Sequence, residues 1–162
     1  MKKINSIRIR AACAEDESIW RDMWESYNVF YGAKVPEDIT TSTWSALIDP
    51  KSSIKALLVL DGSGVIGFAN YVLHSYTWSS SLACLMDDLF VVPEARGKGA
   101  GKLLLQRIID MAKENGWTRV YWMTREGNDT ARSLYNKFCK VDGFVRYTIN
   151  LDGIYPSGGN SK

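Results

Sequence analysis

The chain has few of the residues that mark metal-binding, secreted or membrane proteins. It contains only three cysteines and one histidine, and Cys13, Cys84 and Cys139 are far apart with no Cys-x-x-Cys pair. A structural zinc site needs four closely spaced ligands, so we expect reduced thiols and no metal. There is no apolar leader segment and no run of about 18 apolar residues, which predicts a cytoplasmic protein rather than a membrane protein.

Excess charge and internal repetition are also absent. The formal net charge is +2, and the basic residues are scattered rather than gathered in one run, so the sequence does not indicate a general nucleic-acid binder. A length of 162 residues with 46% hydrophobic residues is typical of one globular domain. We expect a single domain over residues 1–155 and a flexible C-terminal tail over residues 156–162.

The hydrophobic pattern predicts an alternating series of strands and helices. The second helix should be capped near Thr41 or Ser42 and end before Pro50. Residues 54–76 form a hairpin around a glycine-bearing loop, and the strand over 118–125 should lie parallel to the one before it. The remaining strands are expected at residues 6–12, 82–92 and 144–151, and the remaining helices at 15–32, 101–116 and 128–138.

A glycine-rich loop, "RGKGAG", lies between an apolar strand and an apolar-periodic helix. Glycines there let backbone N–H groups converge on an anion at a helix N-terminus. A dinucleotide fingerprint would require glycine where Lys102 stands. A Walker loop would require glycine at Arg96 and a hydroxyl residue at Leu103, so both nucleotide motifs fail.

The loop instead matches the pattern Arg/Gln-x-x-Gly-x-Gly/Ala, and here the sequence resembles the GCN5-related N-acetyltransferase (GNAT) superfamily. The segment "NDTARSLY" followed by Gly143-Phe144 matches a second family signature, and "WRDMWESYNVFYG", "HSYTW", "DDLFV" and "YWMTREGNDTAR" resemble the histone and small-amine (polyamine-type) branch. The segment "NKFCKVDGF" is longer than in most of the superfamily. The resemblance implies an α/β GNAT fold, with a mixed, mostly antiparallel central sheet, a parallel splayed strand pair and flanking helices.

The resemblance also implies the cofactor and the residues that bind it. Acetyl-CoA would be the acetyl donor, with its pyrophosphate on the loop and its thioester beside the main chain of the splayed strand. The cofactor-binding residues carried over are Leu89, Phe90, Val91, Arg96, Gly97, Lys98, Gly99, Ala100, Gly101, Lys102 and Asn128.

Acetyl transfer to an amine needs proton removal, because an alkylammonium with a pKa near ~10.4 is protonated at neutral pH. Asp87 and Asp88 are the candidate proton acceptors, and Asp87 also stands where the polyamine acetyltransferases carry a functional glutamate. Adjacent strand residues face opposite ways, so only one can enter the cleft unless a bulge redirects both. The alternative is an acidic pair that caps loops or faces solvent.

Tyr135 is the candidate acid that protonates the departing thiolate; the alternative is an aromatic residue packed on its helix. Helix-spaced aromatics such as Trp20 and Tyr27 are more often core, whereas Tyr31 and Trp78 lie near predicted loop ends and are candidate acceptor-binding residues.

The predicted function is therefore acetyl transfer from acetyl-CoA to a primary amine by direct attack in a ternary complex. The acceptor could be a small amine, a polyamine, an amino acid or a basic peptide, with no nucleic-acid or membrane partner. A non-catalytic acetyl-CoA sensor or scaffold is the alternative, because fold does not determine function. The resemblance further implies a homodimer formed through the C-terminal strands.

Overall fold

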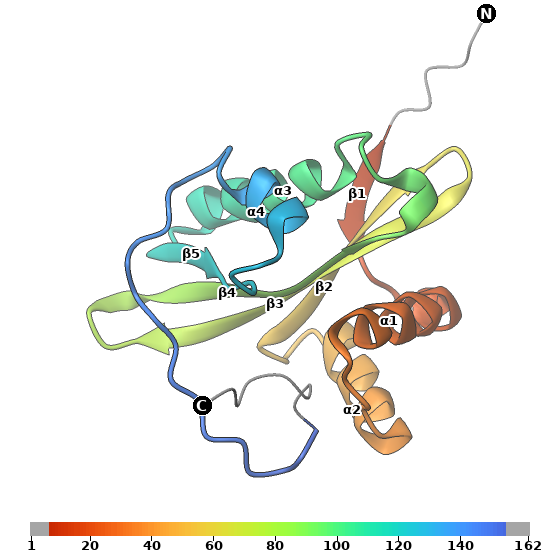
Figure 1. Cartoon of the computed structure of the whole chain (residues 1–162), viewed down its shortest axis with the longest axis horizontal. Helices are drawn as coiled ribbons and strands as arrows, with labels where there is room; N and C mark the ends of the chain where they lie inside the picture. The colour runs from red at the N-terminus through yellow and green to blue at the C-terminus, as the bar shows by residue number, and fades with distance from the viewer. Residues whose placement is uncertain (1–6, 155–162) are drawn as a thin grey trace, which may run out of the picture.

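The computed structural model describes residues 7–154 as one mixed sheet flanked by helices (Figure 1). The tail expected at residues 156–162 lies outside the described residues. In chain order the elements are β1 (Arg8–Ala11), the 3-10 turn η1 (Ala14–Asp16), α1 (Glu17–Tyr31), α2 (Glu37–Ile48), β2 (Ile54–Asp61), β3 (Gly64–Tyr76), β4 (Ser79–Val91), the 3-10 turn η2 (Pro93–Ala95), α3 (Ala100–Asn115), β5 (Arg119–Trp122) and α4 (Asp129–Tyr135).

The sheet has the order β1-β2-β3-β4-β5, and every neighbouring pair is antiparallel except β4 and β5. Tight connections join β2 to β3 and β3 to β4, and such short loops allow only antiparallel pairing. Helix α3 carries the chain back across the sheet between β4 and β5, which makes that pair parallel. The predicted mixed, mostly antiparallel fold is confirmed.

Helices cover both faces of the sheet. Figure 1 shows α3 and α4 on one face and α1 and α2 on the other. Leu104 and Ile108 of α3 are fully buried in the cluster on the first face, while Trp20 of α1 is fully buried in the cluster on the second. Burial of each such side chain contributes about 1.5–3 kcal/mol, so the helical spacing of apolar residues determines which helix faces meet the sheet.

The predicted cap of the second helix was wrong. Helix α2 begins at Glu37, directly after Pro36, and not at Thr41 or Ser42. Glu37 and Asp38 lie in its first turn, where negative charge favours the N-terminal end of a helix. Thr41 is interior to the helix, and its carbonyl accepts a hydrogen bond from the Ser45 hydroxyl at 3.0 Å.

The final predicted strand is also absent from the described part of the chain. Residues 144–151 have no sheet partner and no regular secondary structure. Their apolar side chains are exposed, with Tyr147 and Leu151 more than 90% accessible. A strand needs a neighbour to satisfy its backbone hydrogen bonds, and this segment has none among residues 7–154. Within residues 7–154, no helix is both long and apolar enough to cross a membrane.

Candidate active site

The site begins where β4 and β5 separate. The parallel pairing runs only from Ala83 to Met86 of β4, opposite Arg119–Trp122. Beyond Met86, β4 continues to Val91 paired with β3 alone, so the main chain of Leu89, Phe90 and Val91 has no β5 neighbour. Unpaired strand N–H and C=O groups can bond an extended ligand. The predicted splayed strand pair is therefore present.

The glycine-rich loop lies directly after this splayed end of β4. Gly97 and Gly99 have backbone φ values of 75° and 86°, which residues other than glycine rarely adopt. Gly99 is the N-cap of α3 and provides no side-chain cap, so the first-turn N–H groups remain available. A Cβ atom added at Gly97 or Gly99 would meet no atom within 4 Å, which leaves space beside the backbone. An uncapped helix N-terminus with this space fits a phosphate group.

Two basic residues of the loop are held by backbone carbonyls. The Arg96 Nε donates to the carbonyl of Val91 at 2.9 Å, and the Lys98 Nζ donates to the carbonyl of Glu94 at 3.1 Å. Gly101 has a different role from the other two glycines, because its Cβ would lie 3.3 Å from Leu134 of α4. Its small size allows α3 and α4 to pack closely.

A β-bulge interrupts β4 beside the opening. Asp88 lies opposite Asn70 of β3, but the next pair joins Met86 to Tyr71, so Asp87 has no partner on β3. A bulge inserts one extra residue and changes the direction of the side chains that follow it. The sequence left open whether a bulge redirects both aspartates, and the structure has one at this position.

The bulge brings both acidic residues to the face that carries α1. Met86, before the bulge, packs in the α3-side cluster, whereas Phe90, after it, packs in the α1-side cluster. Regular alternation would put both on the same face, so the bulge reverses the alternation. Asp87 and Asp88 consequently act electrostatically on the same α1 residue, Tyr27.

The two carboxylates differ in their surroundings. Burial, and then the charge of Asp87, raise the pKa of Asp88 to about 6, while hydrogen bonds from Asn70 and Tyr27 oppose the shift. Partial desolvation also raises the pKa of Asp87, but Asp87 is exposed as a residue and Arg146 opposes the shift. A carboxylate with a pKa near 6 can exchange a proton close to neutral pH.

Tyrosines continue the site from Asp88 toward α4. The rings of Tyr27 and Tyr31 lie 4.8 Å apart. Burial, and then Tyr31, raise the pKa of Tyr135 to about 12, which keeps this half-buried phenol protonated at neutral pH. Tyr135 also packs on Trp122, with ring centroids 5.5 Å apart.

The N-terminus of α4 is joined to the end of α1. Asn128 is the N-cap of α4, its Oδ1 accepting from the Ala131 N–H at 3.3 Å and its Nδ2 lying 3.5 Å from the Tyr31 hydroxyl. Arg125 lies over the Tyr31 ring and donates to the Tyr31 carbonyl at 2.9 Å. The polar groups of Asn128 are used in these contacts, and its predicted cofactor contact stays a prediction.

Trp78 is not brought to this cluster. It is 83% exposed at the turn between β3 and β4, and its ring contacts Tyr76. Asp88 lies nine residue steps along β4 from Ser79, a length of about 30 Å at about 3.3 Å per residue.

Sequence reasoning missed three residues that the structure adds to the site. Tyr27 was interpreted as core, and Asn70 and Arg125 were not singled out. A signal for Asn70 was present, because it is a lone polar residue inside the apolar strand "GFANYVL". A buried polar side chain requires a partner, and the partner here is Asp88.

This combination of splayed strands, glycine loop and acidic bulge fits an acyltransferase. Residues 17–140 match the family model of the Acetyltransferase (GNAT) family, and the chain belongs to that family. It is 33% identical over 152 residues to "D-amino-acid N-acetyltransferase HPA3" of Saccharomyces cerevisiae, a match covering 92% of this chain and 94% of that protein.

A second relative agrees with this assignment, and a solved structure shares the fold. The chain is 31% identical over 148 residues to "Uncharacterized N-acetyltransferase YhfO" of Bacillus subtilis, covering 90% of this chain and 98% of that protein. The fold resembles an aminoglycoside N-acetyltransferase AAC(6')-Iy solved in complex with CoA, with a TM-score of 0.78 at 16% identity over 93% of this chain and 98% of the other.

Proposed function

We propose that residues 1–155 act as one catalytic domain that transfers the acetyl group of acetyl-CoA to a primary amine. The observation that carries the proposal is the β4 bulge, which puts Asp87 and Asp88 on the α1 face beside the opening between β4 and β5. Two carboxylates there attract a cationic amine and offer a proton acceptor. The relative named for D-amino acids supports an amino acid or another small amine as the acceptor, and a polyamine or basic peptide has the same reactive group.

The proposed acetyl-CoA site uses the loop and the exposed edge of β4. Backbone N–H groups from Gly97 to Lys102 would hold the pyrophosphate, and the main chain of Leu89 to Val91 would hold the pantetheine arm and the thioester carbonyl. The donor supplies an activated acetyl carbon. Lys102 is exposed at the start of α3, where its charge favours an anion.

The reaction requires two proton movements from the protein side. An aspartate of the bulge takes a proton from the ammonium, and the amine lone pair then attacks the thioester carbonyl carbon. As the carbon–sulfur bond breaks, Tyr135 gives its proton to the departing sulfur and regains one from the new amide nitrogen. One proton is released overall, and the products are the N-acetyl amine and free CoA thiol.

A thiol-release assay tests the proposal. The protein is mixed with acetyl-CoA and, separately, polyamines, D- and L-amino acids, aminoglycosides and basic peptides, and free CoA is followed with a thiol reagent. We expect release above the rate with acetyl-CoA alone for at least one amine. Acetyl-CoA binding by calorimetry without turnover on any amine would refute the enzyme and leave a sensor or scaffold. Tyr31, whose ring packs on that of Tyr27, is the proposed acceptor-side aromatic of this site. Trp78 stays a proposal only for an acceptor long enough to reach the turn between β3 and β4.

We also propose that two copies of the chain associate through residues 144–151. Val145, Tyr147, Ile149 and Leu151 alternate along this segment and are each at least 75% exposed. Alternation of this kind is typical of a strand with one buried face. Leaving four such side chains in water is unfavourable by about 1.5–3 kcal/mol each relative to burial.

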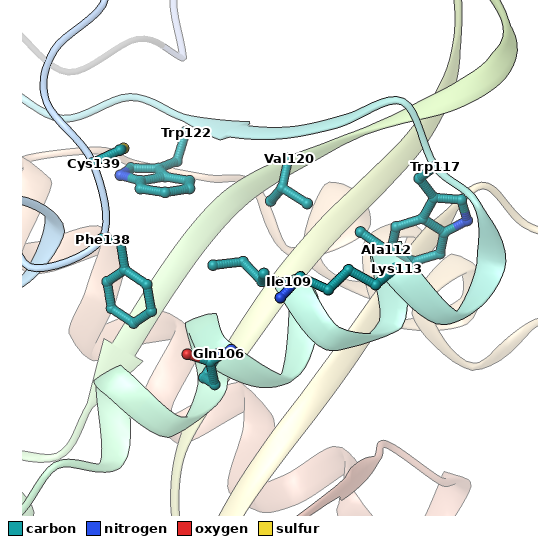
Figure 2. Close-up of a pocket in the computed structure, with 9 residues that line it drawn as sticks. All are labelled: Gln106, Ile109, Ala112, Lys113, Trp117, Val120, Trp122, Phe138 and Cys139. Atoms are coloured by element: carbon teal, nitrogen blue, oxygen red, sulfur yellow. The ribbon is translucent and has the colours of Figure 1, made fainter.

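The surface that fits this segment lies between α3 and the free edge of β5. Among the described residues, β5 pairs only with β4. A groove of about 500 Å³ lies beside it. Figure 2 shows the side chains of α3 in this groove facing Val120 and Trp122. The residues that line the groove are Gln106, Ile109, Ala112, Lys113, Trp117, Val120, Trp122, Phe138 and Cys139.

The proposed occupant is the 144–151 strand of a second copy, since in Figure 1 the chain after α4 passes outside β5 and runs away from α3. Sedimentation should give twice the 18.2 kDa of one chain. Ile149→Asp should produce a monomer, whereas Val29→Asp, at an exposed apolar residue of α1, should not. A monomeric wild-type protein would refute this association of two copies.

We also propose a cytoplasmic location, because Cys13, Cys84 and Cys139 are free thiols.

A further inference from the structure

Asn70 joins α1 to the acidic bulge through the middle of the sheet. It is 3% exposed and lies directly opposite Asp88 in the β3–β4 register. Its Nδ2 donates to the Asp88 Oδ2 at 3.0 Å, and its Oδ1 accepts from the Trp20 Nε1 at 3.4 Å. Trp20 itself is fully buried. Three side chains from three elements therefore form one continuous hydrogen-bonded series.

The Trp20 indole determines which way the Asn70 amide points. An indole N–H can only donate, so it selects the amide oxygen and leaves the amide NH₂ toward Asp88. In the reversed orientation, the amide NH₂ would face the indole N–H, so that two donors would meet. The amide oxygen would then face the Asp88 carboxylate, so that two acceptors would meet. Both contacts of the reversed amide would be repulsive in a buried region. The indole thus controls what Asp88 meets, although it does not touch Asp88.

The other groups that act on Asp88 come from α1 and from β4 itself. Tyr27 of α1 donates a hydrogen bond to the carboxylate, which favours the charged form. The charge of Asp87 favours the protonated form, and Arg146 in turn acts on Asp87. Asn70 is the donor from β3, and the hydrogen bond from Trp20 to its amide oxygen fixes its orientation. Asp87 lacks such a neutral donor on β3, because it has no partner in the register.

We propose that Trp20 and Asn70 are positioning residues that hold Asp88 as a hydrogen-bond acceptor, so that Asp88 rather than Asp87 removes the proton from the acceptor amine. This inference rests on the proposed acetyl transfer. The amine proton passes to an Asp88 oxygen, the nitrogen lone pair forms the new bond to the acetyl carbon, and Asp88 later returns its proton to solvent. Trp20 and Asn70 take part through orientation alone.

The test follows the pH dependence of kcat/KM for the best amine found in the assay. Asn70→Leu removes the donor, which weakens the charged form and should move the acidic limb to higher pH. A hydrogen bond to a charged group contributes about 1.5–3 kcal/mol, so the limb should move by about 1–2 pH units. Trp20→Phe keeps a ring but frees the amide to turn, and should move the limb in the same direction by less.

Trp24→Phe is the matched control. Trp24 is on the same helix and also donates through its indole N–H, but to the Thr40 hydroxyl at 3.3 Å. Its loss should leave the acidic limb where it is in the wild type. A purely structural effect of Asn70 or Trp20 would lower turnover or stability without moving the limb.

A second readout does not depend on turnover. Carboxyl ¹³C NMR of Asp-labelled protein gives the titration of Asp88, identified by its disappearance in Asp88→Asn. The Asp88 titration should move upward in Asn70→Leu and in Trp20→Phe but not in Trp24→Phe. Asn70→Ala replaces Asn70→Leu if circular dichroism shows that the leucine variant does not fold.

The two proposals fail in distinguishable ways. A wild-type protein that releases no thiol with any amine refutes acetyl transfer, and with it the proton-acceptor role of Asp88. The NMR titration still tests whether Trp20 and Asn70 hold the carboxylate. An active wild type whose Asn70 and Trp20 variants keep both the acidic limb and the Asp88 titration overturns the positioning role. An acidic limb that is lost together with most of the turnover in Asp87→Asn, while Asp88→Asn retains both, assigns proton removal to Asp87 instead.

Discussion

The replacement Asp88→Asn should stabilise the protein while it reduces turnover. The substitution preserves the shape of the side chain, and the new amide can still accept from Asn70. What it removes is a carboxylate whose pKa is raised from 3.8 to about 6 by burial and by the charge of Asp87. A raised pKa means that the folded protein disfavours the charged form of this residue.

The magnitude follows from proton linkage. Since each pKa unit corresponds to about 1.36 kcal/mol, the ionised carboxylate lowers the free energy of unfolding by up to about 3 kcal/mol. Because the pKa is raised, the protonated form of Asp88 stabilises the fold relative to the charged form. This contribution to the free energy of unfolding is fully present below pH 3.8 and is lost as the pH rises through about 6. The variant should therefore exceed the wild type by up to about 3 kcal/mol at pH 8 and by about half of that at pH 5.

Thermal unfolding at the two pH values measures this difference. For a chain of this size the gain at pH 8 corresponds to a Tm higher by about 6–12 °C. Asp87→Asn is the comparison, and its gain should be smaller because Asp87 is exposed. A variant less stable than the wild type at pH 8, or a difference that does not change between pH 5 and pH 8, would refute the reasoning.

Three further predictions concern the tyrosine acid, the loop and the N-terminal ion pair. Tyr135→Phe should keep acetyl-CoA affinity but lower turnover by about 10²- to 10⁴-fold, less for an acyl donor with a more acidic thiol; near-normal turnover would reduce Tyr135 to packing. Gly99→Val should abolish CoA binding in calorimetry, whereas Gly116→Val, equally left-handed at the other end of α3, should retain it. Asp16→Asn should lower the free energy of unfolding by about 1.5–3 kcal/mol at pH 7, because Asp16 accepts from Arg10 at 2.6 and 2.8 Å. Arg10 holds the pKa of Asp16 well below its ordinary range, so this loss should shrink below pH 4, and a pH-independent difference in urea unfolding would contradict it.

Local signals in the sequence were enough to predict most elements. Apolar spacing, with glycine at the helix ends, predicted α1 and α3, and both end at a glycine in the left-handed conformation, Gly32 and Gly116. The loop from Arg96 to Gly101 was also predictable, because its glycines and the following helix are adjacent in the chain. The start of α2 was missed because several residues there can cap a helix, and competition among them is decided by the charges of the first turn.

The relation between Asp87 and Asp88 was decided by tertiary structure. Alternation along one strand puts neighbours on opposite faces, and only the register against β3 reveals the extra residue that brings both to α1. The same holds for Trp20 and Asn70, which are 50 residues apart and meet only when α1 packs on the sheet. A hydrogen bond between distant residues leaves no spacing rule in the sequence.

The C-terminal segment, residues 144–151, shows that a sequence pattern alone does not decide whether a strand forms. Its alternating apolar residues are a pattern typical of a strand with one buried face, and this pattern is a property of residues 144–151 alone. Whether the segment forms a strand depends on a neighbour with free backbone groups, and the described chain provides none that it reaches. The sequence by itself thus determined which segments can be helix or strand and which loop can bind an anion. Pairing, register and the face of each acidic side chain were decided only by tertiary structure, because each depends on a partner distant in sequence.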